Sequence, residues 1–180
     1  GLQNIGNTCY MNSVIQCLRN NLDFANYFLS KDFKHNILQK KQSLLTIGWY
    51  KLNVELWKQS KVTKNDAVNP MEFFKVFQNV SNSLDRMVFV GFNQNDAEEF
   101  MLFLLDTIHE SLAYKELEFK INGNCKNKFD EVQKEFYTYL EKYLCFDGIS
   151  IVKSLFCGFQ LSQITNSVNN ATSNCFEPFL

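Results

Sequence analysis

The chain opens with the stretch Gly1-Leu2-Gln3-Asn4-Ile5-Gly6-Asn7-Thr8-Cys9-Tyr10-Met11-Asn12-Ser13. Its two glycines permit a tight backbone path, and Asn7 is expected to cap the amides that follow it. Apolar side chains then recur at the i, i+3, i+4 and i+7 spacing of a helix, at Met11, Val14, Ile15 and Leu18. The pattern therefore predicts a loop that leads into a helix, with Cys9 in the first helical turn.

Cys9 in such a position has a chemical advantage. The unpaired N–H groups and the positive end of the helix dipole favour a thiolate, which is the nucleophilic form of cysteine. Asn4 precedes it on the same loop, and its side-chain amide can turn towards an oxyanion that forms beside Cys9. A cysteine at a helix start is more often a small apolar side chain, and an asparagine in a glycine-rich loop more often serves the turn. Position alone leaves both interpretations open.

The same opening residues resemble the cysteine box of the ubiquitin-specific proteases. Two further stretches resemble that family and follow in the same order, Phe-Asn-Gln-Asn-Asp-Ala-Glu-Glu-Phe at residues 92–100 and Ser-Ile-Val-Lys-Ser-Leu-Phe-Cys-Gly at residues 150–158. The resemblance implies an α+β, papain-like cysteine protease fold. It also implies a deubiquitinating cysteine protease, which hydrolyses the bond after the C-terminal glycine of ubiquitin.

The resemblance assigns roles to four residues. It implies that Cys9 is the nucleophile and that Asn4 stabilises the oxyanion. It implies that Gln94 and Asp96 hold the extended C-terminal tail of ubiquitin, with Asp96 facing the basic side chains of the tail. Asp96 and Glu99 also have the spacing of a capping box before an apolar helix. Capping and binding are compatible, because a carboxylate has lone pairs for both.

The expected domain organisation follows the same family. Residues 1–147 are expected to form a mainly helical thumb that carries the cysteine box and the Gln/Asp motif. Within it the sequence predicts helices over 43–57, from position 70, over 97–112 and over 129–144. Residues 148–180 are expected to begin a β fingers subdomain. There, residues 149, 151 and 155–161 favour strand, and the alternation of Phe159, Leu161 and Ile164 with polar residues predicts a half-buried strand.

Two departures from the family concern a metal and a base. Asn166 and Asn169 stand where many members have the first Cys-x-x-Cys of a structural zinc site, so we predict no metal and no other cofactor. The family's catalytic histidine lies downstream of the fingers, and this chain is expected to be a partial catalytic domain without it. His35 lies among lysines and His109 lies inside a helix, so neither is expected to be the base.

Composition sets wider bounds. With 180 residues and 46% hydrophobic content, the chain can bury a substantial core. A net charge of −1 gives no electrostatic reason to expect nucleic acid or an anionic membrane as a partner. Six cysteines without regular spacing are typical of a reducing compartment, here the cytoplasm or nucleus. Ubiquitin or a ubiquitin conjugate is the expected partner.

Two other function classes stay open. The first is a catalytically incomplete relative that binds ubiquitin without cleaving it, although an intact Cys9 and Asn4 argue against that class. The second is a helical scaffold with no role towards ubiquitin, which would require three motif matches to be coincidental.

Overall fold

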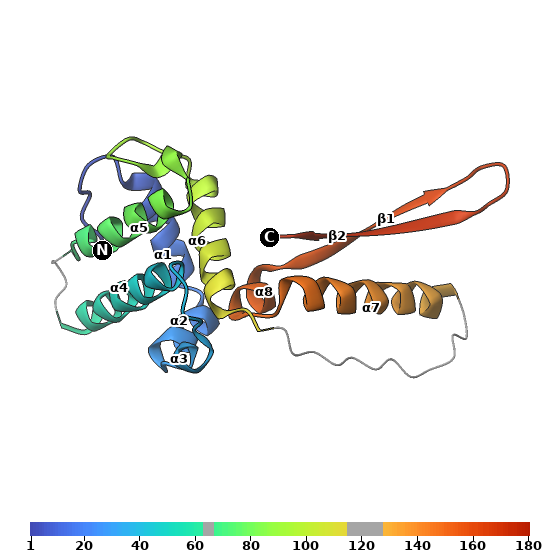
Figure 1. The fold of residues 1–180 in the computed structure, drawn as a ribbon, viewed down its shortest axis with the longest axis horizontal. Helices are drawn as coiled ribbons and strands as arrows, with labels where there is room; N and C mark the ends of the chain where they lie inside the picture. Colours follow the sequence, from blue (N-terminus) through green and yellow to red (C-terminus); the bar gives the residue numbers. More distant parts are fainter. Residues whose placement is uncertain (63–66, 115–127) are drawn as a thin grey trace. The chain divides into compact units, whose positions relative to one another are not determined.

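A computed structural model of the chain describes residues 1–62, 67–114 and 128–180. They form two compact units, Gly1–Leu112 and Ala113–Leu180, which Figure 1 shows as a ribbon coloured along the sequence. These units are defined by contacts within each of them. The boundary between thumb and fingers at residue 147 is a functional division and stays a prediction.

The first unit is helical (Figure 1). Its elements are α1 (Cys9–Arg19), α2 (Leu22–Leu29), α3 (Phe33–Asn36), α4 (Ser43–Val62), α5 (Met71–Ser83), the 3-10 turn η1 (Met87–Phe89) and α6 (Ala97–Leu112). Helix α6 packs on α1 and on α4, and α4 packs on α5. The helices predicted over 43–57, from position 70 and over 97–112 are therefore confirmed, the second of them beginning one residue later.

Aromatic rings fill the core of this unit. Phe24 of α2 and Trp49 of α4 are fully buried, with ring centroids 5.7 Å apart. Phe77 of α5 meets Phe100 of α6 edge to face at 5.1 Å, and Tyr10 of α1 meets the same Phe100 at 5.6 Å. Each such pair contributes about 0.5–1.5 kcal/mol beyond the area it buries. The residue after Cys9 is thereby fixed against α6.

The described part of the second unit combines helices with a hairpin (Figure 1). Its elements are α7 (Lys128–Asp147), α8 (Ile151–Phe156), β1 (Gly158–Thr165) and β2 (Thr172–Phe179). The strands pair antiparallel, with Gly158 opposite Phe179 at one end and Thr165 opposite Thr172 at the other. Phe159 of β1 packs on α7 against Tyr143, with ring centroids 5.4 Å apart. Helix α7 confirms the helix predicted over 129–144.

Two predictions for this unit are wrong. Residues 151, 155 and 156 were expected to favour strand, but they lie in helix α8. The alternation along β1 does not produce a half-buried strand either, because Leu161 is 44% exposed and Ile164 is 73% exposed. The large apolar side chains of the hairpin that are half-buried are instead Phe159 of β1 and Phe176 of β2, which pack on aromatic rings of α7.

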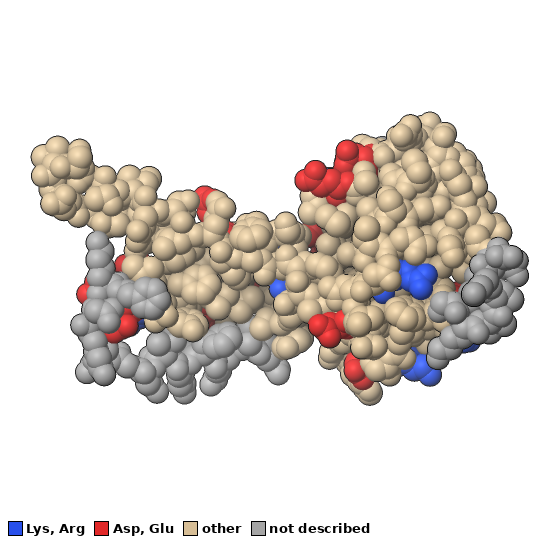
Figure 2. All heavy atoms as spheres, turned by 180° about the vertical axis from the view of Figure 1, so that it is seen from behind, with Lys and Arg blue, Asp and Glu red and all other residues tan. Residues whose placement is uncertain are grey.

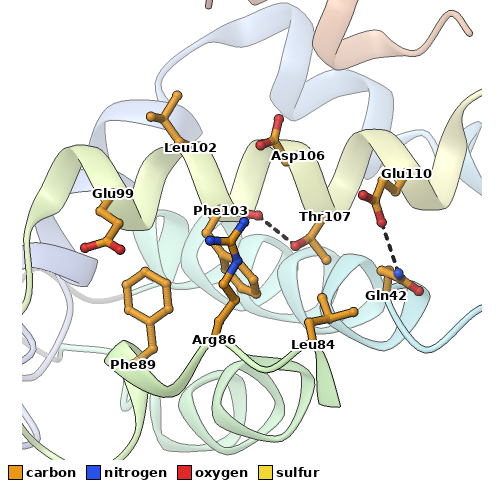
Figure 3. Close-up of a pocket in the computed structure, with 10 residues that line it drawn as sticks. All are labelled: Gln42, Leu84, Arg86, Phe89, Glu99, Leu102, Phe103, Asp106, Thr107 and Glu110. Carbon is orange, nitrogen blue, oxygen red and sulfur yellow. Dashed lines mark hydrogen bonds between the residues drawn. The ribbon is translucent and has the colours of Figure 1, made fainter. Parts of the chain in front are cut away.

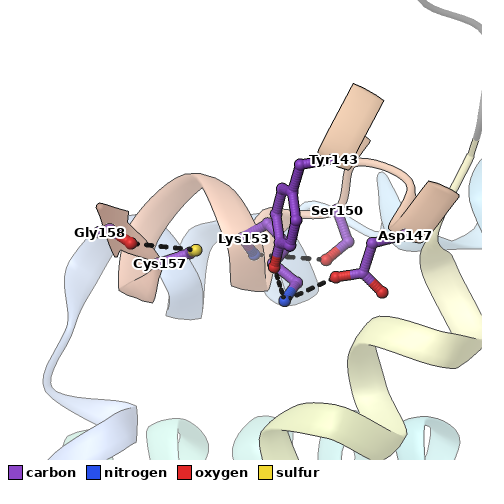
Figure 4. A network of polar contacts seen from close by, with 6 residues as sticks. All are labelled: Tyr143, Asp147, Ser150, Lys153, Cys157 and Gly158. Carbon is purple, nitrogen blue, oxygen red and sulfur yellow. Dashed lines mark hydrogen bonds and ion pairs between the residues drawn. The ribbon is translucent and has the colours of Figure 1, made fainter. Parts of the chain in front are cut away.

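Helix α8 depends on polar contacts that the local pattern does not show (Figure 4). The Ser150 hydroxyl caps it by accepting the N–H of Lys153 at 3.4 Å. The Lys153 ammonium pairs with Asp147 at 2.8 Å and donates to the Tyr143 hydroxyl at 2.8 Å. Burial lowers the pKa of Lys153, but the hydrogen bonds to Asp147 and Tyr143 outweigh it and raise the pKa above its ordinary value.

Candidate active site

Cys9 is the first residue of α1, and its side chain is exposed. The N-cap of this helix is Thr8, whose side chain makes no capping hydrogen bond. The N–H of Asn12 donates to the Thr8 carbonyl at 2.9 Å, which closes the first helical turn around Cys9. The predicted place of Cys9 in a first turn is confirmed.

Asn7 does not cap α1, contrary to the prediction. Its backbone is left-handed, with φ at 50°, and its side-chain amide donates to the carbonyl of Phe92 at 3.0 Å. Gly6 has a φ of 117°, and a Cβ there would lie 3.4 Å from the Phe92 ring. These two residues therefore attach the cysteine loop to the segment that leads into α6.

The other side of the loop is attached to the segment before α5. Leu2 forms a parallel bridge with Val68. In that bridge the Gln3 N–H donates to the Val68 carbonyl, and the Val68 N–H donates to the Gly1 carbonyl, both at 2.8 Å. The Asn12 side chain also donates to the Gln3 carbonyl at 3.0 Å. The loop before Cys9 is thus held on both sides.

Asn4 is held by three donors that converge on one atom. Its Oδ1 accepts from the Gly6 N–H at 3.1 Å, from the Thr8 N–H at 3.3 Å and from the Thr8 hydroxyl at 3.2 Å. Because all three groups donate here, the atom they meet is the amide oxygen. The two N–H groups on Nδ2 of Asn4 therefore lie on the other side of the amide from these donors.

Asp96 caps α6, as its spacing predicted. Its Oδ1 accepts the N–H groups of Glu98 at 2.7 Å and Glu99 at 3.1 Å. Gln94 is exposed just before it. Asp96, Glu98 and Glu99 are exposed as well, and acidic side chains gather at this end of α6 in Figure 2.

Tyr10 connects the two motifs. Burial raises the pKa of its hydroxyl, against the opposing effect of a hydrogen bond with the side chain of Asn95. That contact places the start of α1 beside the start of α6. The structure therefore brings Cys9 and Asn4 to the same end of the first unit as Gln94 and Asp96.

Neither histidine lies at this end. His109 is 5% exposed within α6, about 18 Å along the helix from Ala97 at 1.5 Å per residue. His35 is exposed on α3. The N–H of Leu38, close after it, donates to the carbonyl of Ser111 at 2.9 Å, so His35 belongs to the opposite end of α6. That neither histidine is the base for Cys9 stays a prediction.

Sequence reasoning did not identify a surface hollow beside α6 (Figure 3). Its volume is about 490 Å³, and charged side chains on its rim include Arg86, Glu99 and Glu110. Gln42 donates to Glu110 across one end of it at 3.0 Å. No cysteine or histidine lines the hollow, so it supplies neither a nucleophile nor a base for thiol chemistry.

Residues 1–62, 67–114 and 128–180 show neither a metal-binding cluster nor a membrane-spanning helix. No cluster of three or more His, Cys, Asp or Glu side chains in these ranges is arranged to hold a metal ion. No helix in them has the length and apolar character needed to cross a membrane. The absence of zinc stays a prediction. The five cysteines that the structure describes carry free thiols.

Comparison with known structures defines the class of fold. The chain is similar to a solved SAGA DUB module that contains Ubp8, Sgf11, Sus1 and Sgf73 and is bound to monoubiquitin. The TM-score is 0.64 at 22% identity, over 99% of this chain and 34% of that one. The fold is therefore α+β and papain-like, as predicted.

Sequence comparison identifies the family. The family described as ubiquitin carboxyl-terminal hydrolase matches residues 1–175. Ubiquitin carboxyl-terminal hydrolase Usp2 of Drosophila melanogaster is 34% identical over 99% of this chain. Ubiquitin carboxyl-terminal hydrolase 2 of Homo sapiens is 33% identical over 99% of it. The chain belongs to the ubiquitin carboxyl-terminal hydrolase family, and the resemblance to ubiquitin-specific proteases is confirmed. It spans 18% and 28% of the lengths of these two relatives.

Proposed function

We propose that this chain is part of the catalytic domain of a deubiquitinating cysteine protease, which hydrolyses the bond after the C-terminal glycine of ubiquitin. The observation that carries the proposal is the pairing of an exposed Cys9 at the start of α1 with an Asn4 held by three donors. Membership of the ubiquitin carboxyl-terminal hydrolase family supports it.

In this proposal Cys9 is the nucleophile. Its thiolate attacks the carbonyl carbon of the C-terminal glycine of ubiquitin, and the carbonyl π electrons move to the oxygen. Nδ2 of Asn4 donates to that oxyanion, and the N–H groups that the Thr8 side chain leaves uncapped belong to the same helical turn as Cys9. Collapse of the intermediate breaks the C–N bond and leaves a thioester on Cys9. The amine leaves with a proton from the general acid, and water then hydrolyses the thioester.

The tail of ubiquitin is proposed to lie across Gln94 and Asp96. Oδ1 of Asp96 accepts the two capping N–H groups, and the carboxylate keeps lone pairs on Oδ2 for a ligand. The exposed carboxylate of Asp96 is complementary to a basic side chain of such a peptide segment.

The general base is proposed to come from outside these 180 residues. His35 and His109 are associated with the end of α6 that is opposite to the cysteine loop. The chain alone is therefore proposed to be inactive, because thiol acyl transfer needs a base within hydrogen-bond reach. Six cysteines without regular spacing are typical of a reducing compartment, so the protein is proposed to be in the cytoplasm or nucleus.

A covalent probe tests the nucleophile. The full-length protein is treated with ubiquitin whose C-terminal glycine carries an electrophile, and the adduct is mapped by mass spectrometry. We expect one adduct, on Cys9, and none in Cys9→Ser. Cys17 is the matched control, because it is also exposed and lies near the other end of α1; Cys17→Ser should keep the adduct. An adduct elsewhere, or no adduct on the wild-type protein, would refute the proposal.

A further inference from the structure

The Thr8 side chain is oriented unusually for its position. Thr8 is the N-cap residue of α1 and is 1% exposed. A threonine at an N-cap normally accepts a hydrogen bond from an N–H of the first helical turn. The Thr8 hydroxyl makes no such bond. It is turned back into the loop instead, between the Ile5 N–H at 3.3 Å and Oδ1 of Asn4 at 3.2 Å.

The chemistry of these partners fixes the direction of each hydrogen bond. The Ile5 N–H can only donate, so the Thr8 hydroxyl accepts from it. Oδ1 of Asn4 can only accept, so the single hydroxyl proton of Thr8 points to Asn4. A flipped Asn4 amide would place its N–H groups against the backbone N–H groups of Gly6 and Thr8 and lose both of these bonds. The two backbone donors therefore set the orientation of the Asn4 amide, and the buried Thr8 hydroxyl adds the third bond that holds it there.

We propose that Thr8 is a positioning residue that presents Nδ2 of Asn4 to the oxyanion. This inference rests on the proposed function, because it assumes that Asn4 stabilises an oxyanion beside Cys9. Thr8 acts through Asn4 and does not touch the reacting atoms. By turning away from α1, its hydroxyl also leaves the N–H groups of the first turn uncapped.

Thr8→Val tests the role, because valine removes the hydroxyl and keeps the branched shape. Turnover of a fluorogenic ubiquitin amide by the full-length protein should fall in kcat by about 10-fold to 100-fold. KM should change little, because the hydrogen bond of Asn4 forms in the transition state. Thr8→Ser keeps the hydroxyl and should retain most of the wild-type kcat.

The Asn4→Ala background shows whether Thr8 acts through Asn4. Asn4→Ala alone should lower kcat by about 10²–10³-fold, as the loss of an oxyanion donor does. Thr8→Val should then add little further loss, because coupled residues are not additive. Unchanged kcat in Thr8→Val would overturn the inference. An equal loss in both backgrounds would also overturn it, because Thr8 would then act on the fold.

Crystal structures of the wild-type and variant proteins show whether Thr8 orients Asn4, and they need no measurement of activity. We expect the Asn4 amide to be rotated in Thr8→Val, and in Thr8→Ala if the valine variant does not fold. An unmoved Asn4 amide in the variants would overturn the positioning role. If the wild-type protein does not turn over ubiquitin, the proposed function fails, and the crystal structures still test whether Thr8 orients Asn4.

Discussion

Substitution of Asp96 separates two roles that one carboxylate can have. Oδ1 of Asp96 accepts the N–H groups of Glu98 and Glu99 at the start of α6. Asp96→Ala removes this cap together with the charge. Asp96→Asn keeps an oxygen acceptor for the same two N–H groups and removes the charge alone. The pair of variants therefore distinguishes a residue that only caps α6 from one that also binds ubiquitin.

The expected magnitudes differ for the two roles. Loss of the cap in Asp96→Ala should lower the free energy of unfolding by about 1 kcal/mol. Asp96→Asn should cost less, about 0.3–1 kcal/mol, because only the favourable charge at the helix N-terminus is lost. A lost charged contact with ubiquitin should weaken binding by about 1.5–3 kcal/mol in both variants, which corresponds to roughly 10-fold to 150-fold in Kd.

Calorimetric titration of the full-length protein with ubiquitin measures this effect, with Cys9→Ala in every variant to prevent turnover. Thermal unfolding of the same variants measures how much stability is lost with the helix cap. Glu98→Gln is the matched control, because it removes a neighbouring exposed negative charge and leaves the Asp96 cap in place; it should change Kd little. If Asp96→Asn binds ubiquitin as tightly as the parent protein, Asp96 is a cap and has no role in binding.

Two further predictions concern the metal and the second unit. The purified protein should carry no zinc at the site of Asn166 and Asn169. This prediction would be contradicted if elemental analysis found about one tightly bound zinc per chain and mutagenesis placed it at that site. Lys153→Met should lower the free energy of unfolding by about 1 kcal/mol, because the Lys153 side chain is only 12% exposed beside Asp147. Since the pKa of Lys153 is raised above 10.5 by folding, this stabilisation should be complete below about pH 10.5 and be lost as the pH rises further. Chemical denaturation of the wild-type protein and Lys153→Met at several pH values measures the free energy of unfolding of each. If this free energy depends on pH in the same way in both proteins, the prediction for Lys153 is wrong.

The helices of the first unit were predictable because their apolar periodicity is local. Residues 97–112 show the pattern without any knowledge of their partners, and α6 has those bounds. Helix α8 was missed for the opposite reason. Its short sequence favours strand, and the Ser150 cap and the contacts of Lys153 with Asp147 and Tyr143 oppose that preference. The Ser150 cap is a local signal that the strand preference of its neighbours obscured, whereas the contacts of Lys153 with Asp147 and Tyr143 form only in the folded chain.

In the candidate site, too, the features that depend on local sequence were predictable and those that depend on distant residues were not. The position of Cys9 and the capping role of Asp96 follow from local spacing, and the structure has both. The role of Asn7 does not, because its side chain bonds to Phe92, which is far away in the sequence. The direction of the Thr8 hydroxyl was also unpredictable. A threonine at an N-cap is expected to accept a hydrogen bond from an N–H group of the helix. Only the folded loop shows that the Thr8 hydroxyl donates a hydrogen bond to Asn4 instead.

The central claim is that Cys9 is the nucleophile and that its base lies outside these 180 residues. Hydrolysis of a fluorogenic ubiquitin substrate tests it most directly, with the full-length protein, its Cys9→Ser variant and the 180-residue chain assayed together. We predict turnover by the full-length protein, background rates for Cys9→Ser and no turnover by the short chain. Undiminished turnover by Cys9→Ser would contradict the nucleophile, and robust turnover by the short chain would show that His35 or His109 is the base.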